Sequence, residues 1–228
     1  MIGSQLATKG YEVINGIYSA TEVDRLLAAL NHKGFSGSFG LREFLLINPE
    51  LLTLIFTANF KQVISRLFDA HPQAIKSLYF DKPPSANWLV NWHQDLTVNL
   101  KNRAEADGFI NWRAKDERVT VQPSLDILES ILTARIHLDD CDASNGALRV
   151  IEGSHKRGVI NLKEWMADKQ GVEQICEVKK GGLLLMSPLI LHSSKRTENQ
   201  KHRRVIHIEF SDRKLPNGLV WKEGLKLN

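Results

Sequence analysis

The sequence predicts a mainly β protein, a sandwich or jelly roll with helices from the N-terminal part packed on its outside. Before residue 74, apolar residues recur at helical spacing. After it, short runs rich in β-branched and aromatic residues alternate with turn sequences such as "ASNG" and "KKGG". Many short strands in this arrangement indicate packed sheets, and the preceding helices then cover their outer face.

Length and composition predict one domain. A chain of 228 residues with 43% hydrophobic residues is long enough for a single well-packed core. We expect one domain over residues 1–228, with a helical part over about 1–73 and a jelly-roll core over about 74–212. No run approaches the roughly 20 apolar residues of a membrane helix, and "MIGSQLATKGYEV" lacks a signal-peptide pattern. We therefore expect a soluble, cytoplasmic protein with no membrane partner.

The helical part contains two start signals. In "SATEVDRLLAALNHKG", we expect Ser19 to cap a helix reciprocally with Glu22, and Gly34 to end it. In "NPELLTLIF", we expect Asn48 to cap a second helix with Pro49 in its first turn. The run "FKQVISRLF" continues with helical period.

Seven strands are expected after the helical part: "IKSLYF", "NWLVNWH", "TARIHLD", "ALRVI", "QICEVK", "LLLMS" and "RRVIHIEF". A turn at "DKPPS" separates the first two. The more polar stretch from Thr97 to Thr120 is expected to form an excursion over the mouth of the barrel. The sequence "QPSLDILESI" then predicts a short helix that returns from it.

The stretch "NWHQDLTV" places a histidine and an aspartate two residues apart at the end of a predicted strand. Alternate residues of a strand point to the same face, so His93 and Asp95 could bind one ion while Gln94 points away. An isolated H-x-D pair is weak evidence for a metal, because strands often carry such pairs by chance.

Two other pairs have the same form, His137 with Asp139 and His207 with Glu209. A 2-His-1-carboxylate site needs a second histidine from a distant strand. His192 at the end of "GGLLLMSPLILH" meets that need for the first pair. No histidine follows the pair at 207, and a site built on the pair at 137 leaves the histidine of "NWHQDLTV" unexplained.

An arginine follows on the next predicted strand. Arg203 shares a face with Val205 and His207, and its guanidinium could bind a dicarboxylate by two parallel hydrogen bonds. A lysine does this less well, because an ammonium lacks the planar fork. Three protein ligands would leave the opposite face of the metal ion open for a cofactor and oxygen.

At these residues the sequence resembles the phytanoyl-CoA dioxygenase family of iron(II)- and 2-oxoglutarate-dependent oxygenases. The resemblance runs from about Ser77 to Ser211 and rests on "SLYFDKPPS", "WHQDLT", "LDDCDASNGALRVIEGSHKRG" and "LLLMSPLILHSSKRTENQKHRR", in that order. It implies a double-stranded β-helix, the cupin-like form of the jelly roll.

The resemblance also implies roles for individual residues. The implied iron ligands are His93, Asp95 and His192. The residues implied to bind or line the pocket of 2-oxoglutarate are Arg203, Ser194, Arg135 and Leu78. Arg203 would form a salt bridge with the distal carboxylate of 2-oxoglutarate. Arg135 stands where some members carry an aromatic residue.

The implied activity is hydroxylation of an unactivated C–H bond of a small-molecule metabolite by O2, with conversion of 2-oxoglutarate to succinate and CO2. Related halogenases replace the carboxylate ligand by a small residue, so Asp95 favours hydroxylation. Trp112, in the polar excursion, is a candidate for contact with the substrate. Gln94 and Asn91 are candidates for fixing the imidazole tautomers.

Other functions stay open at this point. The net charge of +4 is a weak indication of an anionic substrate. An oxygenase that modifies nucleic acid or protein is one alternative, although "RRVIHIEFSDRK" lacks the additional arginine-rich signature usual in nucleic-acid demethylases. A jelly-roll protein that binds a metal or ligand without turnover is another, and the full set of iron and cosubstrate residues counts against it. The sequence does not indicate the oligomeric state.

Overall fold

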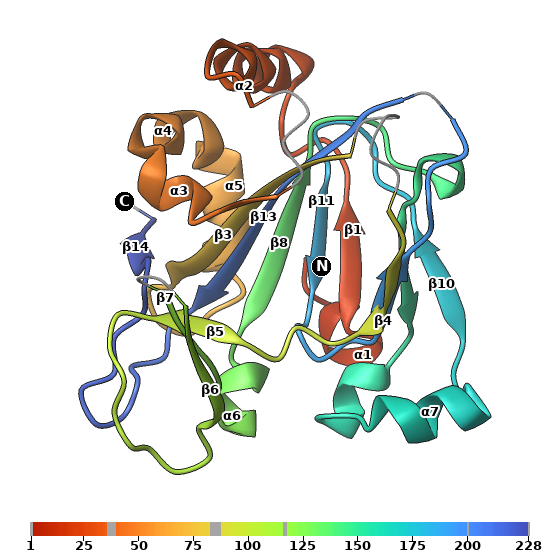
Figure 1. The fold of residues 1–228 in the computed structure, drawn as a ribbon. Coiled ribbons are helices and arrows are strands. Elements are labelled where there is room, and N and C mark those ends of the chain that lie inside the picture. Colours follow the sequence, from red (N-terminus) through yellow and green to blue (C-terminus); the bar gives the residue numbers. More distant parts are fainter. Residues whose placement is uncertain (1, 36–39, 83–87, 116–117, 200, 228) are drawn as a thin grey trace.

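Figure 1 shows the computed structural model of the chain, which describes residues 2–35, 40–82, 88–115, 118–199 and 201–227. The architecture is mainly antiparallel β-sheet with helices on its outside, which confirms the predicted fold class, and the sheets do not close into a barrel. The end of the "DKPPS" turn, at 83–85, lies outside the described residues.

The largest sheet contains seven strands in the described part of the chain. Along its path these are β1 (Tyr11–Ile14), β11 (Leu183–Met186), β8 (Leu132–His137), β13 (Arg203–Ser211), β3 (Gln73–Lys82) and β14 (Leu225–Lys226), with β2 (Leu41–Arg42) also paired to β3. A smaller sheet has the order β10 (Glu173–Cys176), β9 (Leu148–Ile151), β12 (His192–Ser194) and β4 (Val90–His93).

The two faces of the large sheet differ as the alternation along β13 predicts. Ile206 and Ile208 are fully buried in the hydrophobic core that the sheet shares with helices α2 (Ala20–His32) and α5 (Ala58–Ser65). Arg203 and His207 instead line a cavity on the opposite face. The remaining helices and 3-10 helices are α1 (Leu6–Lys9), α3 (Phe44–Ile47), η1 (Pro49–Leu51), α4 (Leu52–Ile55), α6 (Leu125–Glu129), η2 (Ala143–Asn145), η3 (Ser154–Arg157) and α7 (Leu162–Asp168).

The helix caps follow the sequence in one of two cases. The reciprocal cap between Ser19 and Glu22 is present at the start of α2, where each backbone N–H bonds the other side chain at 2.8 and 3.3 Å. Asn48 is the N-cap residue of the 3-10 turn η1, with Pro49 in the first turn, as predicted, but its side chain makes no capping hydrogen bond. Its side-chain amide instead donates to the Phe44 carbonyl oxygen, in the preceding helix, at 2.9 Å.

The first 73 residues are not only helical, as we had expected. Residues 11–14 form β1, which pairs with β11, and residues 41–42 form β2, which pairs with β3. Such short strands carry too little alternation to be recognised locally, and long-range pairing decides their conformation.

The polar excursion folds into its own antiparallel sheet, with the order β5 (Val98–Leu100), β7 (Arg118–Gln122) and β6 (Ile110–Lys115). The predicted return helix is confirmed as α6. Within the described residues, none of the helices combines the length and apolar character needed to cross a bilayer.

Candidate metal and cosubstrate site

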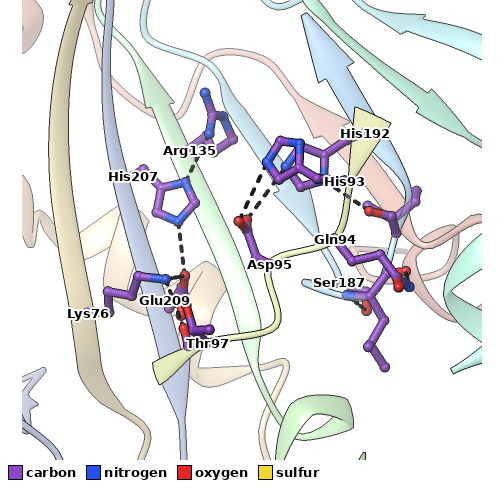
Figure 2. A network of polar contacts seen from close by, with 12 residues as sticks. Lys76, His93, Gln94, Asp95, Thr97, Arg135, Ser187, His192, His207 and Glu209 are labelled. Atoms are coloured by element: carbon purple, nitrogen blue, oxygen red, sulfur yellow. Dashed lines mark hydrogen bonds and ion pairs between the residues drawn. The ribbon is translucent and has the colours of Figure 1, made fainter. Parts of the chain in front are cut away.

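Three candidate ligands meet where β4 and β12 of the small sheet pair. His93 and His192 are direct cross-strand partners, and Asp95 follows β4 with its backbone N–H bonded to the Pro188 carbonyl oxygen at 2.9 Å. One ligand atom from each of the three residues lies within 4.8 Å of the others. Figure 2 shows both imidazoles directed toward the Asp95 carboxylate.

Backbone carbonyls determine the tautomers of both imidazoles. The Nδ1 atom of His93 lies 2.8 Å from the Asn91 carbonyl oxygen, and Nδ1 of His192 lies 2.9 Å from that of Ile190. A carbonyl oxygen only accepts, so both Nδ1 atoms carry the proton and both Nε2 atoms present lone pairs. These Nε2 atoms lie 3.8 and 3.6 Å from the Asp95 oxygens. Two lone pairs facing a carboxylate form a donor set that fits a divalent metal ion.

The pKa directions agree with this donor set. Burial lowers the pKa of His192 to about 4, so its ring is neutral at neutral pH. Burial alone would raise the pKa of Asp95, but interactions with His192 and Lys76 outweigh it and hold the pKa well below its usual value. His192 therefore offers a neutral imidazole and Asp95 a carboxylate.

Contrary to our expectation from the sequence, neither the Gln94 side chain nor the Asn91 side chain fixes an imidazole tautomer. Asn91 contacts the His93 ring through its backbone carbonyl, so the identity of its side chain is not used. Gln94 does not contact either imidazole. Its amide donates to the Gly158 and Leu189 carbonyl oxygens at 2.8 and 2.5 Å and accepts from the Ile160 N–H at 2.8 Å. It therefore ties β4 to the loops beside β12.

A second group, Asp95 with His207 and Glu209, also brings three ligand atoms within 4.8 Å of one another. Hydrogen bonding argues against a metal there. Arg135 donates to Nδ1 of His207 at 2.9 Å, and a guanidinium cannot accept, so the proton of the neutral ring is on Nε2, where the metal would bind. The ammonium of Lys76 lies 2.7 Å from Glu209 and already neutralises that carboxylate.

The pair His137 and Asp139 does not assemble a site within the described part of the chain. Asp139 accepts hydrogen bonds from the guanidinium of Arg204 at 2.8 and 2.5 Å and from its backbone N–H at 2.8 Å. His137 is buried, and neither ring nitrogen has a described hydrogen-bond partner.

A cavity of about 330 Å³ opens over the three candidate ligands. It is lined by Arg42, Lys76, Leu78, Phe80, Trp88, Val90, His93, Asp95, Thr97, Arg135, Leu148, His192, Ser193, Ser194, Arg203 and His207. All four residues expected in the 2-oxoglutarate pocket are among them. A larger cavity of about 690 Å³, lined in part by Leu6, Phe68 and Arg213, lies elsewhere and contains none of the candidate metal ligands.

Arg203 has the burial and the unused hydrogen-bond donor of a candidate anion-binding residue. It is 7% exposed, its Nη1 donates to the Gly146 carbonyl oxygen at 2.7 Å, and its Nε has no hydrogen-bond partner in the described structure. Gly146 has a φ of 77°, which favours glycine, so the Asn145-Gly146 turn positions this carbonyl. Burial lowers the pKa of Arg203, as expected for a cation without a carboxylate partner. The distal carboxylate of 2-oxoglutarate fits this residue.

Trp112 does not line the cavity. Its ring stacks on Phe109 with centroids 6.3 Å apart, and its Nε1 donates to the Phe109 carbonyl oxygen at 3.1 Å. Trp88 lines the cavity instead, although a tryptophan beside a predicted strand is more often part of the core. Sequence reasoning also gave no role to Lys76, which alternation from Leu78 along β3 would have placed on the cavity face.

Comparisons with known proteins identify the family of the chain. The family model described as "Phytanoyl-CoA dioxygenase (PhyH)" matches residues 6–205. No curated protein sequence matches the chain.

Similar solved structures include three with low sequence identity. The non-heme alpha ketoglutarate dependent carbocyclase SnoK from nogalamycin biosynthesis is 18% identical, with a TM-score of 0.71 over 98% of this chain and 86% of SnoK. The epimerase SnoN, in complex with Fe3+, alpha ketoglutarate and nogalamycin RO, is 13% identical, with a TM-score of 0.73 over 100% and 97%. HygX from Streptomyces hygroscopicus, with nickel and 2-oxoglutarate bound, is 15% identical, with a TM-score of 0.64 over 90% and 84%.

At these identities the neighbours show the fold, and the family model shows the membership. The family uses Fe(II), 2-oxoglutarate and O2, and its members are oxygenases. Two features found above fit these groups: a His-Asp-His donor set, and a buried arginine that has no carboxylate partner among the residues that the structure describes. The chain belongs to the phytanoyl-CoA dioxygenase (PhyH) family.

Proposed function

We propose that this chain is an Fe(II)- and 2-oxoglutarate-dependent dioxygenase that hydroxylates an unactivated C–H bond of a small-molecule metabolite and releases succinate and CO2. The observation that carries the proposal is the convergence of the two Nε2 lone pairs of His93 and His192 on the Asp95 carboxylate. Three ligands on one side of an ion leave the other side open for cosubstrate and oxygen.

Each residue has a defined task in this proposal. His93, Asp95 and His192 hold the iron, which with 2-oxoglutarate and O2 supplies the oxidant for the C–H bond. Arg203 binds the distal carboxylate of 2-oxoglutarate through the N–H groups that the Gly146 carbonyl does not use. Ser194, at the end of β12, and Leu78, on β3, line the space between.

The carboxylate ligand supports hydroxylation in particular. Asp95 occupies the position that a halogenase leaves free for a halide. The names of SnoK and SnoN, a carbocyclase and an epimerase, show that this fold also serves other oxidative outcomes. Product identity is therefore part of the test.

The test uses anaerobic protein reconstituted with Fe(II) and 2-oxoglutarate, exposed to O2 with and without a metabolite mixture. We expect O2-dependent succinate formation that the mixture stimulates, and a product one oxygen atom heavier than its substrate. The Asp95→Ala variant is the control. Succinate formation that does not exceed this control would contradict the assignment as a 2-oxoglutarate-dependent oxygenase. A product without an added oxygen atom would be compatible with that assignment but would contradict hydroxylation.

A further inference from the structure

The cavity holds more positive than negative charge. Four cationic side chains line it, Arg42, Lys76, Arg135 and Arg203. In the described part of the chain, Asp95 is the one carboxylate that lines it, and Glu209 lies behind Lys76 at 2.7 Å. Iron(II) and 2-oxoglutarate together add no net charge, because a dication and a dianion cancel. Among the described residues, four positive charges therefore face two negative charges when iron(II) and 2-oxoglutarate are bound.

Strand register places Arg135 in the row of residues beside the candidate metal ligands. His207 on β13 pairs with Arg135 on β8 and with Leu78 on β3, and Leu78 pairs with Arg42 on β2. These four residues form one row across the sheet. Arg203 lies four residues before His207 on β13, about 13 Å along an extended strand. The row containing Arg135 is thus at the level of Asp95, which approaches His207 within 4.8 Å.

A chain of hydrogen bonds fixes the orientation of Arg135 (Figure 2). Its Nη1 donates to Nδ1 of His207 at 2.9 Å, and Nε2 of His207 then donates to Glu209 at 3.3 Å. Glu209 also accepts from Lys76 at 2.7 Å, and Lys76 donates to the Thr97 carbonyl oxygen at 3.1 Å. Each acceptor in this series has no proton of its own to donate to its partner, so the direction of every hydrogen bond is fixed. The guanidinium is therefore held in one orientation.

The bond to His207 leaves one edge of the Arg135 guanidinium without a partner. Nε is buried and has no hydrogen-bond partner among the described residues. Nε and Nη2 form the edge that binds a carboxylate through two parallel bonds. Arg204 uses this same edge on Asp139, with Nε at 2.8 Å and Nη2 at 2.5 Å. Burial, and then the positive charge of Arg203, lower the pKa of Arg135 to about 10, and the Asp95 carboxylate offsets this only in part.

We propose that the substrate is an organic anion whose carboxylate binds Arg135, with His207 as the residue that positions the guanidinium. Arg42, exposed on β2 and part of the cavity lining, attracts the anion to the opening. This assigns Arg135 to the substrate, whereas the family resemblance implied a place beside the cosubstrate. The inference rests on the proposed function, because the charge count assumes bound iron and 2-oxoglutarate.

The test titrates protein loaded with Ni(II) and 2-oxoglutarate, which does not turn over, with hexanoate and with the matched neutral probe hexanamide in a calorimeter. We expect hexanoate to bind with one site per chain and about tenfold more tightly than hexanamide, the effect of one charge-assisted hydrogen bond. Arg135→Gln should remove this preference, and it should weaken 2-oxoglutarate binding at least about tenfold less than Arg203→Gln does. Arg203→Gln, the matched control, should weaken 2-oxoglutarate binding.

The His207 variants separate positioning from folding. His207→Leu should weaken hexanoate binding, whereas His207→Asn, which can accept from Arg135 and donate to Glu209, should recover part of it. Equal affinity of the two probes, absence of hexanoate binding, or loss of 2-oxoglutarate binding in Arg135→Gln equal to that in Arg203→Gln would each overturn the inference. If the wild-type protein fails to bind Ni(II) and 2-oxoglutarate, the proposed function itself fails, and this inference fails with it.

Discussion

His93 and His192 lie opposite each other on β4 and β12, with ring centroids 4.1 Å apart, and each Nδ1 bonds the carbonyl of the residue two positions earlier. The pairing of two short strands therefore sets both the separation and the tautomers of the imidazoles. A slip of one residue in this pairing would turn one ring to the opposite face of the sheet. The candidate metal site thus depends on strand register as much as on residue identity.

Removing the carboxylate should remove metal binding. We expect Asp95→Ala to lower Ni(II) affinity by at least about a hundredfold, because even residues that only support metal ligands contribute 10- to 100-fold. Titration calorimetry of the purified proteins measures this. Asp126→Ala, an exposed aspartate in the first turn of α6, is the control and should bind Ni(II) as wild type does. Unchanged affinity in Asp95→Ala would show that the ion binds elsewhere.

Arginine at position 203 should not be replaceable by lysine. Arg203→Lys keeps the positive charge but loses the planar fork that bonds Gly146 and an anion together. We expect at least about a tenfold loss of 2-oxoglutarate affinity, the cost of about one hydrogen bond to a charged group, with Ni(II) affinity retained. Arg196→Lys in the exposed loop is the matched control. Equal 2-oxoglutarate affinity of the two variants would contradict the proposal that Arg203 binds 2-oxoglutarate.

Breaking the ion pair between Lys76 and Glu209 should lower the free energy of unfolding far more than breaking an exposed pair of equal length. Lys76→Met leaves the Glu209 carboxylate, whose side chain is 2% exposed, without its cation, and should cost about 3–5 kcal/mol of unfolding free energy. Adding Glu209→Gln should recover most of this loss. Lys180→Met breaks the Lys180–Asp24 pair, also 2.7 Å long but exposed, and should cost less than about 1 kcal/mol. Urea denaturation compares the variants, and similar losses for both single variants would refute the argument.

Glu223 should make stability fall as pH rises. Burial raises its pKa to about 7, although hydrogen bonds from Ser77 at 2.6 and 2.5 Å work in the other direction. The folded chain keeps this proton where the unfolded chain, with a pKa near 4.5, has lost it. The contribution of Glu223 to the free energy of unfolding is therefore fully present below about pH 4.5. It decreases between about pH 4.5 and about pH 7, by up to about 1.4 kcal/mol per pH unit.

The Glu223→Gln variant isolates this effect. The glutamine side chain does not titrate in this range. The difference in unfolding free energy between wild type and variant should therefore change across that pH window, because the wild type becomes less stable relative to the variant as pH rises. Denaturant titrations at several pH values measure the difference. A difference that is constant with pH would mean that Glu223 titrates equally in both states.

Local sequence patterns determined several features of this protein. Period-two alternation along β13 placed Arg203 and His207 on one face, and the capping pattern at Ser19 started α2 at the right residue. The spacing of His93 and Asp95 indicated a possible metal-binding pair, because side chains two residues apart in an extended strand point to the same face. All of these signals act over a few residues, so the sequence contains them directly.

The tertiary structure supplied the physical reason to prefer the pair at 93, which the sequence had already favoured, over the two similar histidine-carboxylate pairs. The pair at 207 is occupied by Arg135 and Lys76, which come from β8 and β3, and the aspartate of the pair at 137 is bound by Arg204. The cavity likewise excludes Trp112 and includes Trp88. These outcomes depend on hydrogen bonds between strands far apart in sequence, and protonation of an imidazole is set by the partner that packing brings to its other nitrogen.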